Sequence, residues 1–156
     1  YKYKHTVDAL SFIPYGVIVD EFQHIVYENP DLTPEERKAE YLKLEEKYRP
    51  YLSFDGIPYL EKGTRWQYQM HIYESPFYYI DYCIAQCVAL GFLCLSREDF
   101  DGALEKYVAF LKATGGISLS QLVENAGLTS PFASGSLADT AAGASKVIKE
   151  LELRIS

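Results

Sequence analysis

Helix start signals recur along this sequence, and they constrain its fold more than any other feature. At Thr33-Pro34-Glu35-Glu36 a capping threonine precedes proline at the first helical position and glutamate at the third, which together form a capping box. The residues after it favour a helix up to Tyr48, and Arg49-Pro50 ends that helix. No stretch alternates between apolar and polar residues as a half-buried strand does. The sequence therefore predicts an all-α fold.

Further helices are expected on both sides of this one. Apolar residues at helical spacing predict a helix over 7–27, with a start or a kink at Pro14-Tyr15-Gly16. A helix over 64–73 is expected after a connecting loop over 53–62. In the last third of the chain, three start signals predict three more helices: Ser96 with Asp99, Ser118 with Gln121, and the alanine-rich run after Gly135.

The most apolar helix is expected to begin at Ser75-Pro76, a capping serine followed by proline, and to run through Leu95. Its nearly continuous apolar sequence predicts a central helix that is buried on most sides. The uncharged stretch over 83–96 is about half as long as a bilayer crossing requires, and it contains Gln86. We therefore expect no membrane span.

Three cysteines, Cys83, Cys87 and Cys94, fall in this apolar helix. Their odd number and helical spacing favour small buried side chains in a reduced, cytoplasmic protein over a disulfide framework. Core packing is also favoured over metal binding, because no other soft ligand is near them in the sequence.

The charge balance excludes one class of partner. The 156 residues carry 15 basic and 22 acidic side chains, a formal net charge of -7, and this sign is wrong for a surface that neutralises phosphates. Nucleic acid is therefore not an expected partner. The 48% hydrophobic content is enough for a globular core, so a disordered chain is not expected either.

A metal site is poorly supplied with ligands. His24 lies four residues from both Asp20 and Glu28, so a histidine and a carboxylate could hold one side of a metal. Ordinary charge pairing on a solvated helix face explains the same residues and is favoured. Neither a His-Glu-x-x-His nor a Cys-x-x-Cys motif occurs in the sequence, so no zinc motif is complete.

The segment over 71–82 holds the densest group of functional side chains. On a helix that begins at Pro76, Tyr78 and Tyr79 lie four and three residues before Tyr82, so two or three phenols share one face. Together with the imidazole of His71 and the exposed amides of a first helical turn, these phenols suit an oxyanion or a peptide carbonyl. By residue type alone, an aromatic patch that only packs is favoured over a site.

Several motifs in register resemble the C-terminal part of oligoendopeptidase F, in the thimet-oligopeptidase-like family of zinc metallopeptidases. The resemblance continues through Gly115-Gly116 and residues 126–132, so it covers nearly the whole chain. The motifs are Ile13-Pro14-Tyr15-Gly16, Val19-Asp20-Glu21-Phe22-Gln23-His24, Tyr27-Glu28-Asn29-Pro30, Trp66-Gln67-Tyr68-Gln69-Met70-His71-Ile72-Tyr73, Pro76-Phe77-Tyr78-Tyr79-Ile80-Asp81-Tyr82 and Ala85-Gln86.

This resemblance implies a larger, mostly helical zincin peptidase whose deep cleft admits short peptides. It implies a zinc ion held by the two histidines of His-Glu-x-x-His and by a glutamate of the following helix, all upstream of Tyr1. The chain is then a single helical unit over 1–156, the C-terminal fragment of a catalytic domain whose zinc-ligand helices belong to a missing N-terminal part. Alone it is expected to be inactive, and it is expected to self-associate through apolar surface left uncovered.

The resemblance also implies roles for particular residues. His71 matches a histidine that binds the peptide backbone, and Tyr79 and Tyr82 match a Tyr-x-x-Tyr pair that donates hydrogen bonds to the tetrahedral intermediate, with Tyr82 as the oxyanion donor. The turn between histidine and tyrosines, Glu74-Ser75-Pro76, is one residue shorter than in the thimet branch, so Tyr78 competes for either role. The alternative is a non-enzymatic helical module that binds a peptide or a partner helix in an aromatic cleft.

Overall fold

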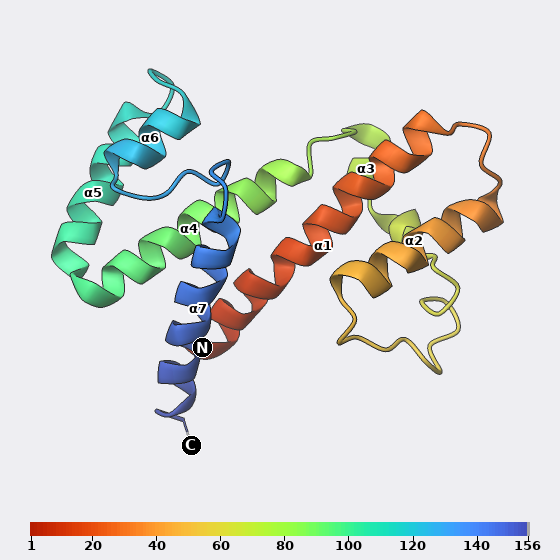
Figure 1. The fold of residues 1–156 in the computed structure, drawn as a ribbon, viewed down its shortest axis with the longest axis horizontal. Helices are drawn as coiled ribbons and strands as arrows, with labels where there is room; N and C mark the ends of the chain where they lie inside the picture. Colours follow the sequence, from red (N-terminus) through yellow and green to blue (C-terminus); the bar gives the residue numbers. More distant parts are fainter. Residues whose placement is uncertain (156) are drawn as a thin grey trace. The chain divides into compact units, whose positions relative to one another are not determined.

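The structure is a computed structural model, and it describes residues 1–155. These residues form seven α-helices and one short 3-10 helix, η1, with no β-strand among them (Figure 1). The predicted all-α class is therefore confirmed. Contacts divide the chain into two compact units, described here separately. The central-segment unit is Phe12–Cys83, and the terminal-segment unit joins Tyr1–Ser11 to the chain from Ile84 onward. The expectation of one helical unit over the whole chain stays a prediction.

Helix α1 spans Lys2–Glu28 without interruption and contains Pro14. A helix was expected here, but its start is not at Pro14-Tyr15-Gly16. Proline inside a helix removes one intrahelical hydrogen bond. Burial outweighs that loss in the following turns, where Ile18 and Val19 are fully buried in the core of the central-segment unit.

Helix α2 spans Pro34–Tyr48, as its start and stop signals predict. The hydroxyl oxygen of Thr33 accepts a hydrogen bond from the backbone amide of Glu36, and the Glu36 carboxylate accepts one from the backbone amide of Thr33. Near the end of the helix, Glu45 and Arg49 form a buried ion pair in which each side chain is only 6% exposed. This pair fixes the last turn of α2, since separating it would leave a charge buried without a partner.

The prediction of one helix over 64–73 is wrong, because the structure has two short helices in this region instead. η1 spans Arg65–Tyr68 and α3 spans His71–Glu74. Gln69 separates them with a backbone ψ of 90°, which is extended rather than helical. Its side chain makes hydrogen bonds to Tyr15 and His71, and a residue held in this way does not continue the helix.

Helix α4 spans Ile80–Glu98, so the predicted start at Pro76 is also wrong. The chain makes a turn before it, in which Phe77 has a φ of 63°. The backbone amide of Phe77 donates a hydrogen bond to Gln23 Oε1 at 2.8 Å, and its ring packs 4.8 Å from that of His24. These contacts with α1 hold Phe77 in the left-handed region. A residue with this backbone conformation cannot belong to a right-handed helix, so α4 begins only after it.

Burial of α4 on most sides is not what the structure shows. Cys83, Cys87, Val88 and Leu90 are buried, but Ala85 and Ala89 are exposed. By length and composition alone α4 could cross a membrane, with a mean hydropathy of 1.4. Core helices of soluble proteins have the same properties, and Cys83 of α4 packs closely against Gly16, where a Cβ would lie 2.0 Å from its sulfur.

The core of the central-segment unit is largely aromatic. Phe22 of α1 is fully buried, with its ring centroid 5.2 Å from that of Tyr41 and 5.1 Å from that of Trp66. The cluster contains these residues and Ile18, Val19, Leu44, Ile72 and Tyr79. Side chains from α1, α2, η1 and α3 therefore meet in one core, and this core positions the segment that carries His71.

The terminal-segment unit contains α5 (Phe100–Ala113), α6 (Leu119–Asn125) and α7 (Ser136–Glu152). The capping box of Ser118 with Gln121 is present at α6, as predicted. At α5 the cap is Asp99 alone, because Ser96 still belongs to α4 and donates a hydrogen bond to the carbonyl of Leu93.

The cysteines serve as small packing residues, as the sequence indicates. Cys83 and Cys87 are buried and Cys94 is half-buried. Within the terminal-segment unit, Cys94 packs against Gly143, where a Cβ would lie 2.8 Å from the cysteine sulfur. Burial raises the pKa of the Cys87 and Cys94 thiols, so both are poor nucleophiles and weak metal ligands at neutral pH.

Gly63→Ala is expected to destabilise the protein more than Gly56→Ala does. Both glycines have positive φ, 69° at Gly63 and 77° at Gly56, so each alanine costs about 1–2 kcal/mol in backbone strain. At Gly63 the new Cβ would also lie 2.3 Å from the carbonyl oxygen of Lys38, whereas at Gly56 it meets nothing within 4 Å. We expect a further loss of about 1–3 kcal/mol at Gly63 from overpacking. Urea unfolding monitored by tryptophan fluorescence measures both, and equal losses would show that the close contact is relieved at little cost.

Candidate functional site

Four predicted site residues lie together in the central-segment unit: His71, Tyr78, Tyr79 and Tyr82, which we call the His–Tyr cluster. The imidazole centroid of His71 lies 5.0 Å from the ring centroid of Tyr79, 5.7 Å from that of Tyr82 and 6.4 Å from that of Tyr78. Tyr82 in turn lies 5.3 Å from Tyr78 and 5.4 Å from Tyr79. The sequence grouping is therefore present in space.

The reason for the grouping differs from the one the sequence suggested. His71 begins α3 and Tyr82 lies in the first turn of α4, but Tyr78 and Tyr79 belong to the turn that precedes α4. Helical spacing therefore does not bring Tyr78 to Tyr82. The turn around Phe77 does so, since it folds the chain back between the two helices.

The three phenols of the cluster differ in burial. Tyr78 and Tyr82 are 47% and 40% exposed, so neither is sealed in the interior. Tyr79 is only 9% exposed, and its ring packs against Phe12 at 5.8 Å and Tyr15 at 6.0 Å between centroids. Tyr82 and Tyr78 are therefore the phenols that can meet a ligand directly, while Tyr79 forms the buried wall behind them.

The phenols of Tyr79 and Tyr82 keep their protons over a wide pH range. Burial raises the pKa of Tyr79 to about 12. A side-chain hydrogen bond with Tyr78 raises the pKa of Tyr82 above its usual value. At neutral pH both groups are therefore neutral hydrogen-bond donors, and neither supplies a base or a phenolate nucleophile.

A further pair of residues contacts the cluster, and sequence reasoning assigned it no role. Gln69 Nε2 lies 2.8 Å from Nδ1 of His71, and the hydroxyl of Tyr15 donates a hydrogen bond to Gln69 Oε1 at 2.8 Å. Tyr15 and Gln69 are 54 residues apart, so no local spacing pattern could have paired them. Both do occur in the motifs that carry the family resemblance, which is the one signal that marked them.

His24 is paired with a carboxylate of its own helix, as the favoured interpretation predicts. Its Nε2 lies 3.6 Å from the carboxylate of Asp20, and the His24 side chain is 57% exposed. Across residues 1–155, no three histidine, cysteine or acidic side chains are placed to hold a metal ion. The residues described here therefore do not fit a zinc site.

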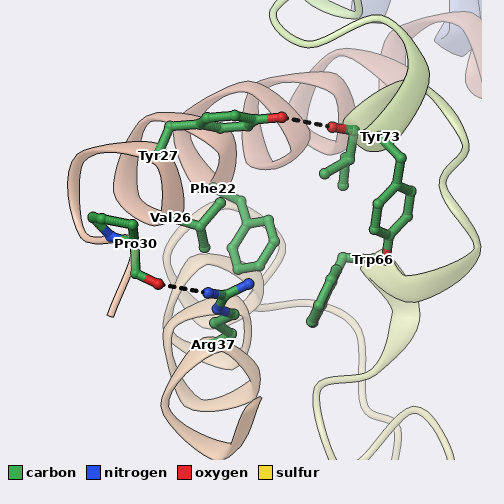
Figure 2. A pocket seen from close by; sticks show the side chains of 8 residues that line it. Phe22, Val26, Tyr27, Pro30, Arg37, Trp66 and Tyr73 are labelled. Carbon is green, nitrogen blue, oxygen red and sulfur yellow. Dashed lines mark hydrogen bonds between the residues drawn. The ribbon is translucent and has the colours of Figure 1, made fainter. Parts of the chain in front are cut away.

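A pocket of about 290 Å³ lies in the same unit, apart from the His–Tyr cluster. Figure 2 shows Trp66, Phe22 and Tyr73 around it, with the guanidinium of Arg37 at one end. Arg37 donates hydrogen bonds to the carbonyls of Pro30 and Leu32, so its guanidinium is bound to the backbone on one side of the pocket. The pocket offers an aromatic surface for binding and no group for hydrolysis.

The fold and the cluster together define an all-helical segment in which the half-buried imidazole of His71 lies beside two exposed phenols, Tyr78 and Tyr82. The family model described as Peptidase family M3 matches residues 2–141. This chain belongs to peptidase family M3. No curated protein matches it.

Solved structures agree with this family. A 3.1 Å X-ray structure of a protein assigned as oligoendopeptidase F has a TM-score of 0.88 and 46% identity, and the match covers 96% of this chain and 26% of that one. PZ peptidase A with an inhibitor has a TM-score of 0.88 and 45% identity, covering 96% and 27%. A protein assigned as oligoendopeptidase F from Bacillus anthracis str. Ames has a TM-score of 0.74 and 39% identity, covering 96% and 23%. The chain thus spans about a quarter of the length of these proteins.

Proposed function

We propose that this chain supplies the substrate-binding and oxyanion-stabilising wall of a zinc-dependent oligoendopeptidase that hydrolyses short peptides. Its membership of peptidase family M3 supports the reaction class. The observation that carries the proposal is the meeting of one imidazole and three phenols in a cluster whose outer two phenols are exposed. Neutral donors at such a place stabilise the negative charge that develops on a carbonyl oxygen under attack.

The roles follow from burial and protonation. Tyr82 is the oxyanion donor, because this residue is 40% exposed and its phenol keeps its proton. His71 binds the peptide backbone next to it. Tyr79 completes the pair from the buried side, and Tyr78 is placed to compete with Tyr82 because the two rings are in contact.

Membership of peptidase family M3 is the only support for zinc in the proposed enzyme. The described residues lack a ligand set, so the metal would be held by a separate, N-terminal part of the peptidase. That part would be the obligatory partner of this chain, and the chain alone would bind no zinc and cleave no peptide. The whole enzyme is proposed to be cytoplasmic, because thiols such as those of Cys83 and Cys87 stay reduced in that compartment.

Exposed apolar residues on α5 support the proposed self-association of the isolated chain. Phe100 is 65% exposed and Leu111 is 51% exposed, and Leu104 between them is also exposed. Apolar residues this close together on one helix are usually covered by a partner. Sedimentation of the isolated chain would reveal dimers or larger species, and a monodisperse monomer over a wide concentration range would contradict this part of the proposal.

Complementation tests the proposed function directly. Zinc content and cleavage of a quenched fluorescent peptide are measured for the 156-residue chain alone, and again with the N-terminal part of an M3 peptidase added or fused. We expect no zinc and no cleavage from the chain alone, and both in the complemented protein. A well-folded, zinc-loaded complemented protein that cleaves no peptide would overturn the proposal.

The aromatic pocket favours one alternative, a module that binds a peptide or a partner helix without hydrolysis. Its walls of Phe22, Trp66 and Tyr73 suit an apolar side chain. Under this alternative, the chain alone would bind the quenched peptide and quench or shift the emission of Trp66, while complementation would add no cleavage.

A further inference from the structure

The side-chain oxygen and nitrogen of Gln69 take part in two different hydrogen bonds, in which the oxygen accepts and the nitrogen donates. A glutamine amide has one accepting oxygen and one donating nitrogen, so its orientation is decided by its partners. Here the oxygen accepts from the hydroxyl of Tyr15, and the nitrogen faces Nδ1 of His71, both at 2.8 Å.

The partners of Tyr15 determine this orientation. The guanidinium carbon atoms of Arg65 and Arg49 lie 4.8 Å and 5.1 Å from its ring centroid, so both cations pack against this phenol. A guanidinium donates and cannot accept, so neither arginine can take the phenol proton. Tyr15 therefore donates its proton to the oxygen of Gln69, which leaves the amide nitrogen of Gln69 to face His71.

We propose that Gln69, anchored by Tyr15, is a positioning residue that holds neutral His71 in the tautomer with its proton on Nε2. Because Gln69 donates to Nδ1, that nitrogen must present a lone pair, and the ring proton must be on the other nitrogen. The benefit of this tautomer rests on the proposed function. With its proton on Nε2, His71 can donate a hydrogen bond to a peptide carbonyl even when the imidazole carries no charge. The contact also fixes the ring orientation, since Gln69 itself is held from α1 through Tyr15.

The tautomer can be read directly from the chain, without any peptidase activity. In ¹⁵N-histidine-labelled protein, at a pH where histidine is neutral, a protonated ring nitrogen and a lone-pair nitrogen have well-separated shifts. The protein has three histidines, and the signals of His71 are assigned by their loss in His71→Gln. We expect Nε2 of His71 to be protonated and Nδ1 to show the shift of a lone-pair nitrogen.

Substitution of Gln69 provides the decisive comparison. Gln69→Glu keeps the shape but replaces the donor by a carboxylate that only accepts, so Nδ1 of His71 is expected to gain the proton. Tyr15→Phe removes the anchor and leaves the amide free to turn, so a mixture of both tautomers is expected. Gln67→Glu is the matched control, because Gln67 lies two residues away and its side chain accepts from Tyr59 instead, so the His71 shifts should not change.

Two results would overturn the inference. One is a wild-type His71 with its proton on Nδ1. The other is a folded Gln69→Glu variant whose His71 shifts equal those of the wild type, and if that variant does not fold, unchanged shifts in Tyr15→Phe have the same meaning. Failure of the peptidase assay would count against the proposed function alone, because these spectra do not depend on hydrolysis.

Discussion

Tyr82→Phe is expected to lower kcat/KM of the complemented peptidase about 100- to 1,000-fold, the usual effect of removing one oxyanion donor. The substitution removes only the hydroxyl, and the ring that packs against Tyr78, Tyr79 and His71 stays in place. Zinc content should be unchanged, because Tyr82 is not part of any metal site among the described residues. Steady-state cleavage of the quenched peptide, with zinc measured on the same sample, tests this expectation.

Tyr107→Phe is the matched control for this experiment. Tyr107 lies on α5 in the other unit, is 44% exposed, and packs edge-on against Phe92. It should keep full activity after loss of its hydroxyl. A tenfold loss or less in Tyr82→Phe would move the oxyanion role to Tyr79 or Tyr78, and the corresponding phenylalanine variants would then be compared. If none of the three substitutions lowered the rate, the proposed wall would not take part in catalysis.

Phe22→Ala is expected to lower the free energy of unfolding of the central-segment unit by about 3–5 kcal/mol, because it removes a large side chain from a packed core. Phe22 is fully buried, and its ring contacts both Tyr41 and Trp66. The cavity would form between α1, α2 and η1, where the polar hydroxyl of Tyr41 is itself buried without a hydrogen-bond partner. The size of the loss depends on how far the side chains around this cavity can move to close it.

The single tryptophan makes this loss easy to measure. Trp66 lies 5.1 Å from Phe22 between ring centroids, so its fluorescence reports unfolding of this core, with far-UV circular dichroism as the second probe. Phe100→Ala is the matched control, since Phe100 is 65% exposed and its loss should change stability by about 0.5 kcal/mol or less. Similar losses in both variants would mean that Phe22 does not anchor the core as the structure indicates.

Local signals predicted the helices well wherever the helix end depends on neighbouring residues. The capping boxes at Thr33 and Ser118 depend on a hydroxyl and on the side chain three positions later, and both are present in the structure. Such ends are stabilised within one turn of chain, so the order of residues suffices to find them.

Two helix boundaries failed because distant residues determine them. Pro76 has the local features of a first helical residue, yet the bond from Phe77 to Gln23 and the packing on His24 keep the chain out of the helix until Ile80. At Gln69 the break is linked to a side-chain bond with Tyr15, 54 residues away. A local pattern contains no information about these partners.

The grouping of the candidate residues in space was predicted in part for the same reason, while their roles stay a prediction. His71, Tyr78, Tyr79 and Tyr82 are close in the sequence, so any compact fold of their segment brings them near one another. The order of burial among the phenols was not predictable, since Phe12 and Tyr15 of α1 are what enclose Tyr79. Gln69 was missed as a partner of His71 because its amide is directed by Tyr15, which also comes from α1.

The sequence by itself determined that this protein is helical, where its capped helices begin, and which segment carries imidazole and phenol groups. These properties depend on contacts between residues a few positions apart. The local sequence is therefore enough to predict them. Only the tertiary structure decided where α4 begins, which phenols reach solvent, and how His71 is held. Those outcomes depend on α1 packing across the 71–82 segment, and that contact exists only when the chain is folded.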